Sequence, residues 1–425
     1  MCDRKALAMF AACAVLAGAG LARAEGQAKS PLTLQPTYLD ETTPAPAAAE
    51  AAPAPTPDKP LMGLLKSAGI GNALADANIN IYGFVEGSYN YNFMSPANDV
   101  NVGRVFDTQS NRFRMNQLDL TVERTVDATK GKFDVGGRME WIYGSDAGFI
   151  HSFGLFDYYN APLDPINQVD LNQAYVDFAL PFGGGLNIRA GKFVTLLGAE
   201  TINPTSLPFY SRSYLFGFAI PFTHTGVLGT YHINDKWIID AGVVRGWEDS
   251  TKDKNTAPSY LGRVTYVASK DASFYLSGIT GPEMADNTRD FRTVIDLVAT
   301  WQATEALKLT ANADYGRESN AAPDGSDAQW YGVALYGAYK INDYVTANIR
   351  GEWFRDEDGT RLGLGATSVY EGTVGVTITP APNSDVWKNL MIRPELRWDH
   401  SSDDIFNGGT DKDQVTAAVD VIFQY

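Results

Sequence analysis

The sequence has almost no cysteine and very little histidine. Its two cysteines, Cys2 and Cys13, lie in the N-terminal stretch, and its four histidines are scattered along the chain. None of these histidines has a second ligand within about two to four residues, which is the spacing of a zinc site. Beyond Cys13 there is no thiol to form a disulfide, bind a metal or act as a nucleophile. We therefore expect neither a metal nor a cofactor.

Long apolar runs and an excess of basic residues are also missing. No interior segment reaches the roughly 18 consecutive apolar residues of a transmembrane helix. The 34 Lys and Arg residues are outnumbered by 50 Asp and Glu residues, which gives a formal net charge of −16. Because nucleic-acid phosphates attract basic proteins, this composition excludes a nucleic-acid partner.

The first residues have the organisation of a secretory signal peptide. Arg4 and Lys5 precede the apolar stretch "ALAMFAACAVLAGAGLA", and small residues in "ARA" end at Ala24. This pattern predicts export and cleavage of residues 1–24. A lipidated Cys13 is the competing interpretation, because "FAAC" loosely resembles a lipobox.

Composition then changes twice along the chain. Residues 25–60 contain "TTPAPAAAEAAPAPTPDKP" and show no periodicity, so we expect a disordered periplasmic tether. Residues 61–78 are expected to form a short amphipathic helix or linker. From residue 79 to residue 425, apolar and polar residues alternate with the period of a β-strand.

The alternation is clear in individual segments. In "KLTANADYG", Leu309, Ala311 and Tyr315 share one face, and Lys308, Asn312 and Asp314 share the other. Similar segments repeat to the C-terminus, and their boundaries are defined to within about 2–4 residues. They predict sixteen strands, at 79–93, 112–126, 131–144, 168–180, 185–195, 225–233, 236–247, 258–268, 271–280, 290–302, 305–317, 327–341, 344–355, 367–380, 386–399 and 412–425.

The connections between these segments alternate in length. Every second one is tight, as in "PFGGG", "SKD" and "ATE", and those between are long and polar. Short turns at one end and long loops at the other are typical of a bacterial outer-membrane barrel. We therefore predict an all-β fold, a transmembrane antiparallel up-and-down β-barrel of about sixteen strands, with fourteen or eighteen as alternatives.

The tryptophans support the same interpretation. All eight lie at or near predicted strand ends, which predicts two aromatic belts at the membrane interfaces. Trp237, Trp301 and Trp387 adjoin short turns, and Trp141, Trp247, Trp330, Trp353 and Trp398 adjoin long loops.

The last strand shows why the apolar face must meet lipid. In "DQVTAAVDVIFQY", Val415, Ala417, Val419, Val421, Phe423 and Tyr425 share one face, and no chain follows to cover them. Strands in hydrocarbon must pair all their backbone groups, so the last strand is expected to pair with the first. The terminal aromatics Phe423 and Tyr425 resemble the C-terminal signal by which such barrels are handed to the barrel assembly machinery.

Residues from about Ile79 to Tyr425 also resemble the putative β-barrel porin family described as OmpL-like. The resemblance is carried by "IYGFVEGSYNYNF", "RMNQLDLTVER", "LNQAYVDFALPFGGGLNIRAGKFVTLLGAE", "YSRSYLFGFAIPFTHTGV" and "IRPELRWD", among other segments. It implies an outer-membrane channel and says less about the solute.

The face opposite the lipid face carries charges of both signs. A sixteen-stranded barrel is wide enough to hold water, so these side chains are candidates for lining a pore. The alternative is that they pair with one another and tie the wall together. The candidate residues are Arg138, Glu140, Asp314, Arg350, Glu352, Arg393, Glu395, Arg397 and Asp399.

The third long loop, residues 195–224, is rich in aromatics and poor in charge. Such a loop is expected to fold inward, as the corresponding loop of porins does. We predict a pore constriction made by Arg189, Lys192, Glu200, Arg212, Tyr210 and Tyr214. The alternative, an aromatic lid packed against the inner wall, is compatible with it.

Taken together, these features predict an exported porin of the Gram-negative outer membrane that lets small hydrophilic solutes diffuse passively. Its expected partners are membrane lipid and lipopolysaccharide, the assembly machinery, the solutes themselves and other copies of the chain in a homo-oligomer. A structural or adhesin barrel with a plugged lumen is the alternative. A barrel hydrolase using His151 or His400 is a weaker one, because catalytic triads are recognised by geometry and not by adjacency.

Overall fold

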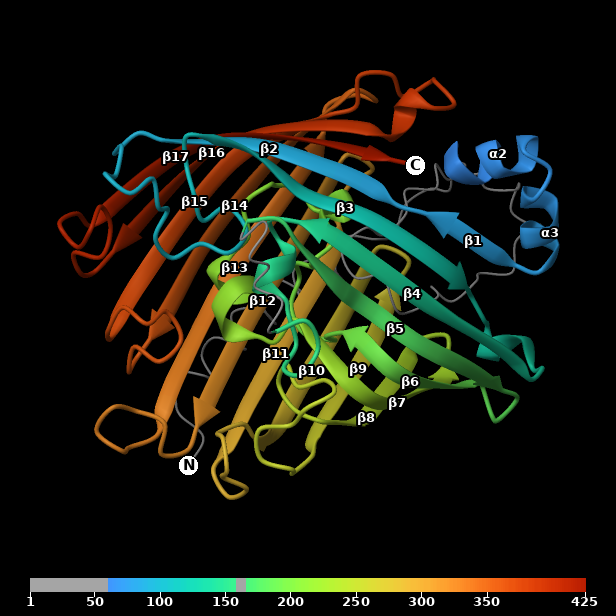
Figure 1. Cartoon of the computed structure of the whole chain (residues 1–425), viewed down its shortest axis with the longest axis horizontal. Helices are drawn as coiled ribbons and strands as arrows, with labels where there is room; N and C mark the ends of the chain where they lie inside the picture. Colours follow the sequence, from blue (N-terminus) through green and yellow to red (C-terminus); the bar gives the residue numbers. More distant parts are fainter. Residues whose placement is uncertain (1–59, 158–165) are drawn as a thin grey trace.

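The computed structural model describes residues 60–157 and 166–425, and the chain forms a closed antiparallel barrel (Figure 1). The predicted signal peptide and nearly all of the predicted tether lie outside the described residues. The strands are β1 (Ile79–Tyr82), β2 (Phe84–Asn92), β3 (Arg112–Arg124), β4 (Asp134–Gly144), β5 (Gln168–Leu180), β6 (Leu186–Val194), β7 (Thr223–Asn234), β8 (Trp237–Val244), β9 (Ser259–Ser269), β10 (Ala272–Pro282), β11 (Phe291–Gln302), β12 (Leu307–Glu318), β13 (Ala328–Lys340), β14 (Val345–Asp356), β15 (Thr367–Ile378), β16 (Leu390–Ser401) and β17 (Asp413–Gln424).

The barrel closes where β17 meets β2. Their antiparallel register runs from Thr416 opposite Asn92 to Gln424 opposite Phe84. The segments β1 and β2 are two parts of one strand interrupted at Gly83, where an added Cβ would lie 2.1 Å from the Asp119 carbonyl oxygen. The seventeen strand segments of the sheet therefore make sixteen strands around the barrel, as predicted.

The connections confirm the expected alternation. Sequential strands pair with each other, and short turns follow β3, β5, β7, β9, β11 and β13, with a somewhat longer one after β15. The long loops lie at the other end. Two of them matter for the lumen: the first loop, residues 93–111, and the third loop, residues 195–222.

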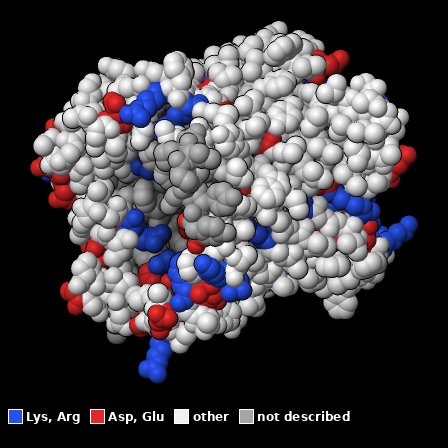
Figure 2. Space-filling model, viewed as in Figure 1, with Lys and Arg blue, Asp and Glu red and all other residues white. Residues whose placement is uncertain are grey.

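The outward face is apolar and exposed, as the strand periodicity predicts. Val374, Ile349 and Leu396 each keep about half of their side-chain surface open, at 51%, 58% and 47%. A water-soluble protein would rarely expose so much contiguous apolar surface. The face seen in Figure 2 is correspondingly uncharged over most of its area, with acidic and basic residues gathered in a few clusters. Lipid is the medium that such a surface requires.

Residues 60–78 form two short helices, α2 (Pro60–Ser67) and α3 (Gly71–Asp76), beside β1 at the end of the barrel where the C-terminus lies (Figure 1). Met62 of α2 is buried and its sulfur accepts a hydrogen bond from the Ile81 N–H at 3.3 Å. In the described part of the chain, no helix has both the length and the apolarity needed to cross a bilayer.

The prediction of two tryptophan belts is wrong for two residues. Trp247 and Trp330 are 5% and 0% exposed and belong to an apolar cluster inside the barrel. The indole of Trp330 donates a hydrogen bond to the Ala219 carbonyl of the third loop at 3.1 Å. Both residues lie near long loops as expected. Trp330 points inward because it shares the lumen-facing register of Ala334 and Tyr336 on β13, and Trp247, just after β8, packs in the same apolar cluster.

Candidate functional site

The third loop folds into the barrel. It contains the short helical turns η3 (Pro204–Ser206) and η4 (Leu215–Ala219), and its side chains Phe209, Tyr210 and Phe216 are almost fully buried. At its root, the Leu196 carbonyl accepts a hydrogen bond from Ser277 on β10. A loop with so few charges and so many aromatics gains more from burial than from water, which explains its position.

Two carboxylates of the wall bind the backbone of this loop. Glu352 on β14 accepts hydrogen bonds from the N–H groups of Tyr214 and Leu215, each at 2.7 Å. Glu395 on β16 accepts them from Tyr210 at 2.8 Å and Ser211 at 3.2 Å. A buried carboxylate needs such donors to offset the loss of hydration. These two candidates for pore lining therefore hold the third loop in place.

Three arginines of the same wall bind carbonyl oxygens of the loop. Arg393 donates to the carbonyls of Pro204 and Leu207 at 2.9 and 2.6 Å. Arg350 donates to the Ser211 carbonyl at 2.8 Å, and Arg397 donates to the carbonyl of Arg212 at 2.5 Å. The loop is thus fixed through its main chain as well as through its buried side chains.

Arg350 also joins two carboxylates. It forms an ion pair with Glu200 of the third loop at 2.9 Å and with Glu371 of β15 at 3.0 Å. Arg350 is 1% exposed. Glu200 keeps this ion-pair partner only while the loop stays docked, whereas Arg350 and Glu371 both belong to the wall.

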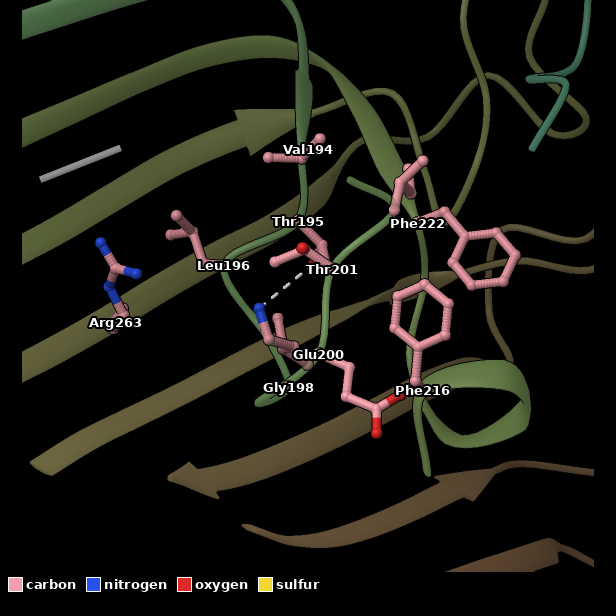
Figure 3. A pocket seen from close by; sticks show the side chains of 11 residues that line it. Val194, Thr195, Leu196, Gly198, Glu200, Thr201, Phe216, Phe222 and Arg263 are labelled. Carbon is pink, nitrogen blue, oxygen red and sulfur yellow. Dashed lines mark hydrogen bonds between the residues drawn. The ribbon is translucent and has the colours of Figure 1, made fainter. Parts of the chain in front are cut away.

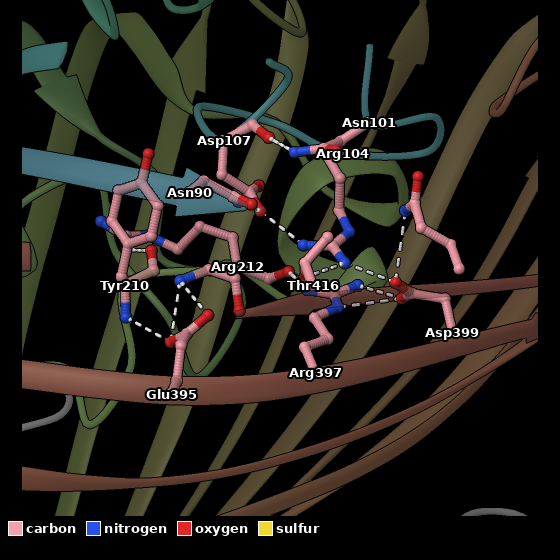
Figure 4. A network of polar contacts seen from close by, with 12 residues as sticks. Asn90, Asn101, Arg104, Asp107, Tyr210, Arg212, Glu395, Arg397, Asp399 and Thr416 are labelled. Atoms are coloured by element: carbon pink, nitrogen blue, oxygen red, sulfur yellow. Dashed lines mark hydrogen bonds and ion pairs between the residues drawn. The ribbon is translucent and has the colours of Figure 1, made fainter. Parts of the chain in front are cut away.

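The first loop is fastened to the same place (Figure 4). Its Arg104 reaches Asp399 of β16 at 2.5 Å and also pairs with Asp107. Asp399 in addition binds Arg397 and accepts a hydrogen bond from the Tyr214 hydroxyl at 3.0 Å. One wall carboxylate therefore ties together the first loop, the third loop and the barrel.

Sequence reasoning missed Arg104 and Asp107. The signal was the pair of opposite charges three residues apart within "NVGRVFDTQ", an otherwise weakly charged segment. It was also missed that Glu371 and Asp420 are the wall partners of Arg350 and Arg393.

The opposite wall carries its charges in pairs across neighbouring strands. Arg189 makes two hydrogen bonds of 2.9 Å to Asp177 and lies over the ring of Tyr175 at 3.8 Å. Lys192 pairs with Asp170 at 3.1 Å. This arrangement is the one expected if the charges tie the wall together.

Three further candidates also lie in the lumen wall. Arg138 and Glu140 pair with each other at 2.6 Å on β4. Asp314 lies opposite Asp296 across the β11–β12 pair, and both are fully buried.

The predicted constriction residues therefore fall into two groups. Glu200, Arg212, Tyr210 and Tyr214 lie in the third loop, and each is 5% exposed or less. Arg189 and Lys192 lie in the β6 strand wall. Within the described residues, no hydrogen bond or ion pair joins the loop group to Arg189 or Lys192, so the structure does not bring all six together in one ring.

A small cavity remains at the root of the third loop (Figure 3). Its volume is about 30 Å³, and Leu196, Phe216 and Phe222 line it together with Glu200 and Arg263. A space of this size accommodates water and not a solute. The docked loop is therefore closely packed against the barrel on this side.

Apolar side chains from several loops form one cluster above the charged contacts. Phe106 of the first loop lies 5.9 Å from Phe216 of the third, and Phe216 lies 5.0 Å from Phe222, between ring centroids. Ile150 and Phe406 come from other long loops. Several long loops thus contribute buried side chains to one apolar cluster inside the barrel mouth.

The histidines do not form a recognisable hydrolytic site. His400 contacts Asp413 at 2.9 Å and stacks on Trp398, and no serine hydroxyl hydrogen-bonds to it among residues 60–157 and 166–425. The same residues contain no group of three or more His, Cys, Asp or Glu side chains suited to a metal ion.

Comparison with known proteins agrees with this architecture. The family model described as "Putative beta-barrel porin-2, OmpL-like" matches residues 78–425. No protein of curated function matches the chain.

Among solved structures, the outer membrane channel DcaP of Acinetobacter baumannii is similar at a TM-score of 0.55 and 16% identity, over 82% of this chain and 97% of that one. An anion-selective porin from Comamonas acidovorans is similar at 0.57 and 12% identity, over 82% and 99%. OmpT, an outer membrane protein of Vibrio cholerae in a trimer form, is similar at 0.54 and 10% identity, over 82% and 99%. At such identities the likeness concerns the fold alone.

Proposed function

The chain belongs to the OmpL-like family of β-barrel porins, which makes it an outer-membrane channel, and we propose that small hydrophilic solutes diffuse passively through its lumen past the third loop. The observation that carries this proposal is the docking of that loop. Main-chain contacts to Glu352, Glu395 and Arg393 hold it inside the barrel against β14 to β16. The same loop is also bonded to β3, β10 and β12 through Gln117, Ser277 and Asn312, so it narrows the bore from more than one side.

The proposed path runs along the wall of β4 to β9. There Arg138, Arg189 and Lys192 form ion pairs with Glu140, Asp177 and Asp170, and each of these side chains keeps only a small part of its surface exposed to a passing solute. Glu200, Arg212, Tyr210 and Tyr214 act on the other side by setting the shape of the loop. The two groups of candidate residues thus have different roles: one lines the path and the other positions the constriction.

Liposome swelling tests the proposal. Vesicles containing the purified mature protein are expected to swell in isotonic arabinose and to swell far more slowly in a large oligosaccharide, because only the smaller sugar fits beside the docked loop. Protein-free vesicles are the control. A structural or adhesin barrel with a plugged lumen would pass neither sugar, and that result would contradict the channel.

We further propose that Phe423 and Tyr425 form the assembly signal. The Tyr425 N–H donates to the Gly83 carbonyl at 2.8 Å, so the last residue completes the closing seam. Replacing Phe423 and Tyr425 by Ala is expected to reduce the folded barrel recovered from outer membranes several-fold. Heat-dependent migration on gels measures it. The control is Gln424→Ala, and equal recovery of both variants would count against the signal.

We also propose a homo-oligomer, because a trimer form is described for the similar barrel from Vibrio cholerae. The same gels, run without heating, distinguish a trimer from a monomer. Migration of the folded protein only at the monomer position, before and after chemical cross-linking in membranes, would reject the oligomer.

A further inference from the structure

The guanidinium groups of two arginines and the indoles of two tryptophans lie together at the mouth of the barrel. The Arg361 guanidinium, in the loop after β14, lies 5.1 Å from the Trp247 ring and 4.9 Å from the Trp330 ring, measured to the centroids. Arg292 lies 4.8 Å from the same Trp247 ring. Cation–π contacts of this kind stabilise a charge without using its hydrogen-bond donors.

These side chains are held rigidly. Arg361 donates from Nε to the Phe218 carbonyl of the third loop at 2.7 Å. Trp330 is fixed by its bond to the Ala219 carbonyl, and it fits only because residue 316 is glycine, since a Cβ there would lie 2.0 Å from the indole. The guanidinium plane is therefore oriented before any solute arrives, which reduces the cost of binding one.

The terminal nitrogens of Arg361 are available. In the described part of the chain, Nη1 and Nη2 make no hydrogen bond, and no carboxylate lies within ion-pair distance of them. Arg361 as a whole is partly buried, and its Nη atoms are not among the fully buried side-chain nitrogens without a partner, so they keep some contact with solvent. Burial and the nearby Arg292 charge lower the pKa of Arg361 to about 10, which still leaves it protonated at neutral pH.

The acids around Arg361 are already engaged. Asp356 accepts hydrogen bonds from the backbone N–H groups of residues 360, 361 and 362. Glu318 is bound by Arg292 at 2.8 and 2.9 Å. Glu248 accepts from the Phe222 N–H at 3.0 Å, and burial raises the pKa of its carboxyl. Among the described residues, no carboxylate contacts the Arg361 guanidinium, whereas Arg292 has Glu318 as its partner.

We propose that Arg361 forms an anion-binding site at the channel mouth, where its two Nη groups capture the carboxylate of a small organic acid. Two parallel N–H donors match the two oxygens of a carboxylate, and the flanking indoles exclude water from the contact. The inference rests on the proposed channel function, for which it names a class of solute.

Calorimetric titration of the detergent-solubilised, folded barrel with potassium benzoate tests the site, with benzamide as the uncharged counterpart. The wild type is expected to bind benzoate and not benzamide. Arg361→Gln is expected to weaken benzoate binding by about tenfold or more, because it removes a charge-assisted bidentate contact. Arg361→Lys keeps the positive charge but lacks the two parallel Nη donors. Its affinity for benzoate is expected to be intermediate, which separates the contribution of the paired donors from that of the charge.

The matched control is Arg289→Gln, which removes one positive charge from an exposed position in a neighbouring loop. It is expected to bind benzoate as the wild type does, and heat-dependent gel migration establishes that each variant is folded. Equal affinity of folded Arg361→Gln and wild type would overturn the site. Calorimetry measures binding without conduction, so the two proposals can fail separately. A barrel that binds benzoate but passes no solute would overturn the channel alone. A conducting barrel whose Arg361→Gln variant binds benzoate as tightly as the wild type would overturn the site alone.

Discussion

Deleting residues 207–218 is expected to raise the single-channel conductance of the barrel roughly two- to threefold, because a sixteen-stranded barrel is wide enough for water once its inner loop is removed. The segment includes the backbone groups that Glu352 and Glu395 bind, so its removal takes away the part of the third loop attached to β14 and β16. Planar-bilayer recording of the purified variant in potassium chloride measures the change.

The control deletion removes residues 323–326, the exposed tip of the loop between β12 and β13. Its conductance is expected to equal that of the wild type, since this tip lies away from the third loop's contacts. If deletion of residues 207–218 left the conductance unchanged, the third loop would not be the constriction. It would then be a lid packed on the inner wall for rigidity.

Replacing Arg350 by Met is expected to lower the free energy of unfolding by about 3–5 kcal/mol, because it leaves buried carboxylates without their counter-charge. Arg350 contacts Glu200 and Glu371 at 2.9 and 3.0 Å and binds the Ser211 carbonyl, so one substitution loosens the wall and the third loop together. Urea unfolding in detergent micelles measures the stability, and increased current noise reports the loosened loop.

Arg355 on the same strand supplies the control for this substitution. It pairs with Glu357 at 3.0 Å with both side chains partly exposed, and Arg355→Met is expected to cost less than about 1 kcal/mol. Adding Glu371→Gln to Arg350→Met should recover part of the loss, because it removes one of the unpaired charges. Equal stability of the Arg350 and Arg355 variants would show that the triad does not hold the loop.

The interpretation of the wall charges changed most between sequence and structure. Arg350, Glu352, Arg393 and Glu395 alternate with lipid-facing residues, so their inward direction was predictable from period two alone. Their partners were not, because these are backbone groups of a loop some 140 to 190 residues earlier in the chain. Periodicity predicts the direction of a wall side chain, but the position of the folded loop determines which groups that side chain contacts.

The same distinction separates the tryptophans. Trp237, Trp387 and Trp398 are largely exposed at strand ends, where an amphipathic ring is favoured at a membrane interface. Trp247 and Trp330 have similar positions in the sequence but are buried beside the third loop and Arg361. Trp330 has the lumen-facing parity of β13, opposite to the exposed Leu335 and Tyr339, so strand alternation predicts its inward direction, whereas Trp247 lies beyond the end of β8.

By itself the sequence determined the barrel, its strand number and its lipid face, because these follow from residue alternation, turn lengths and the cost of unpaired backbone in hydrocarbon. The aromatic composition of residues 195–224 and their resemblance to a porin loop indicated the inward folding. The tertiary structure alone decided which charges meet. Arg104 and Asp399 are 295 positions apart and become partners only when the first loop enters the closed barrel. Such contacts depend on the positions of the loops in the folded barrel, and the spacing of residues along the chain does not indicate these positions.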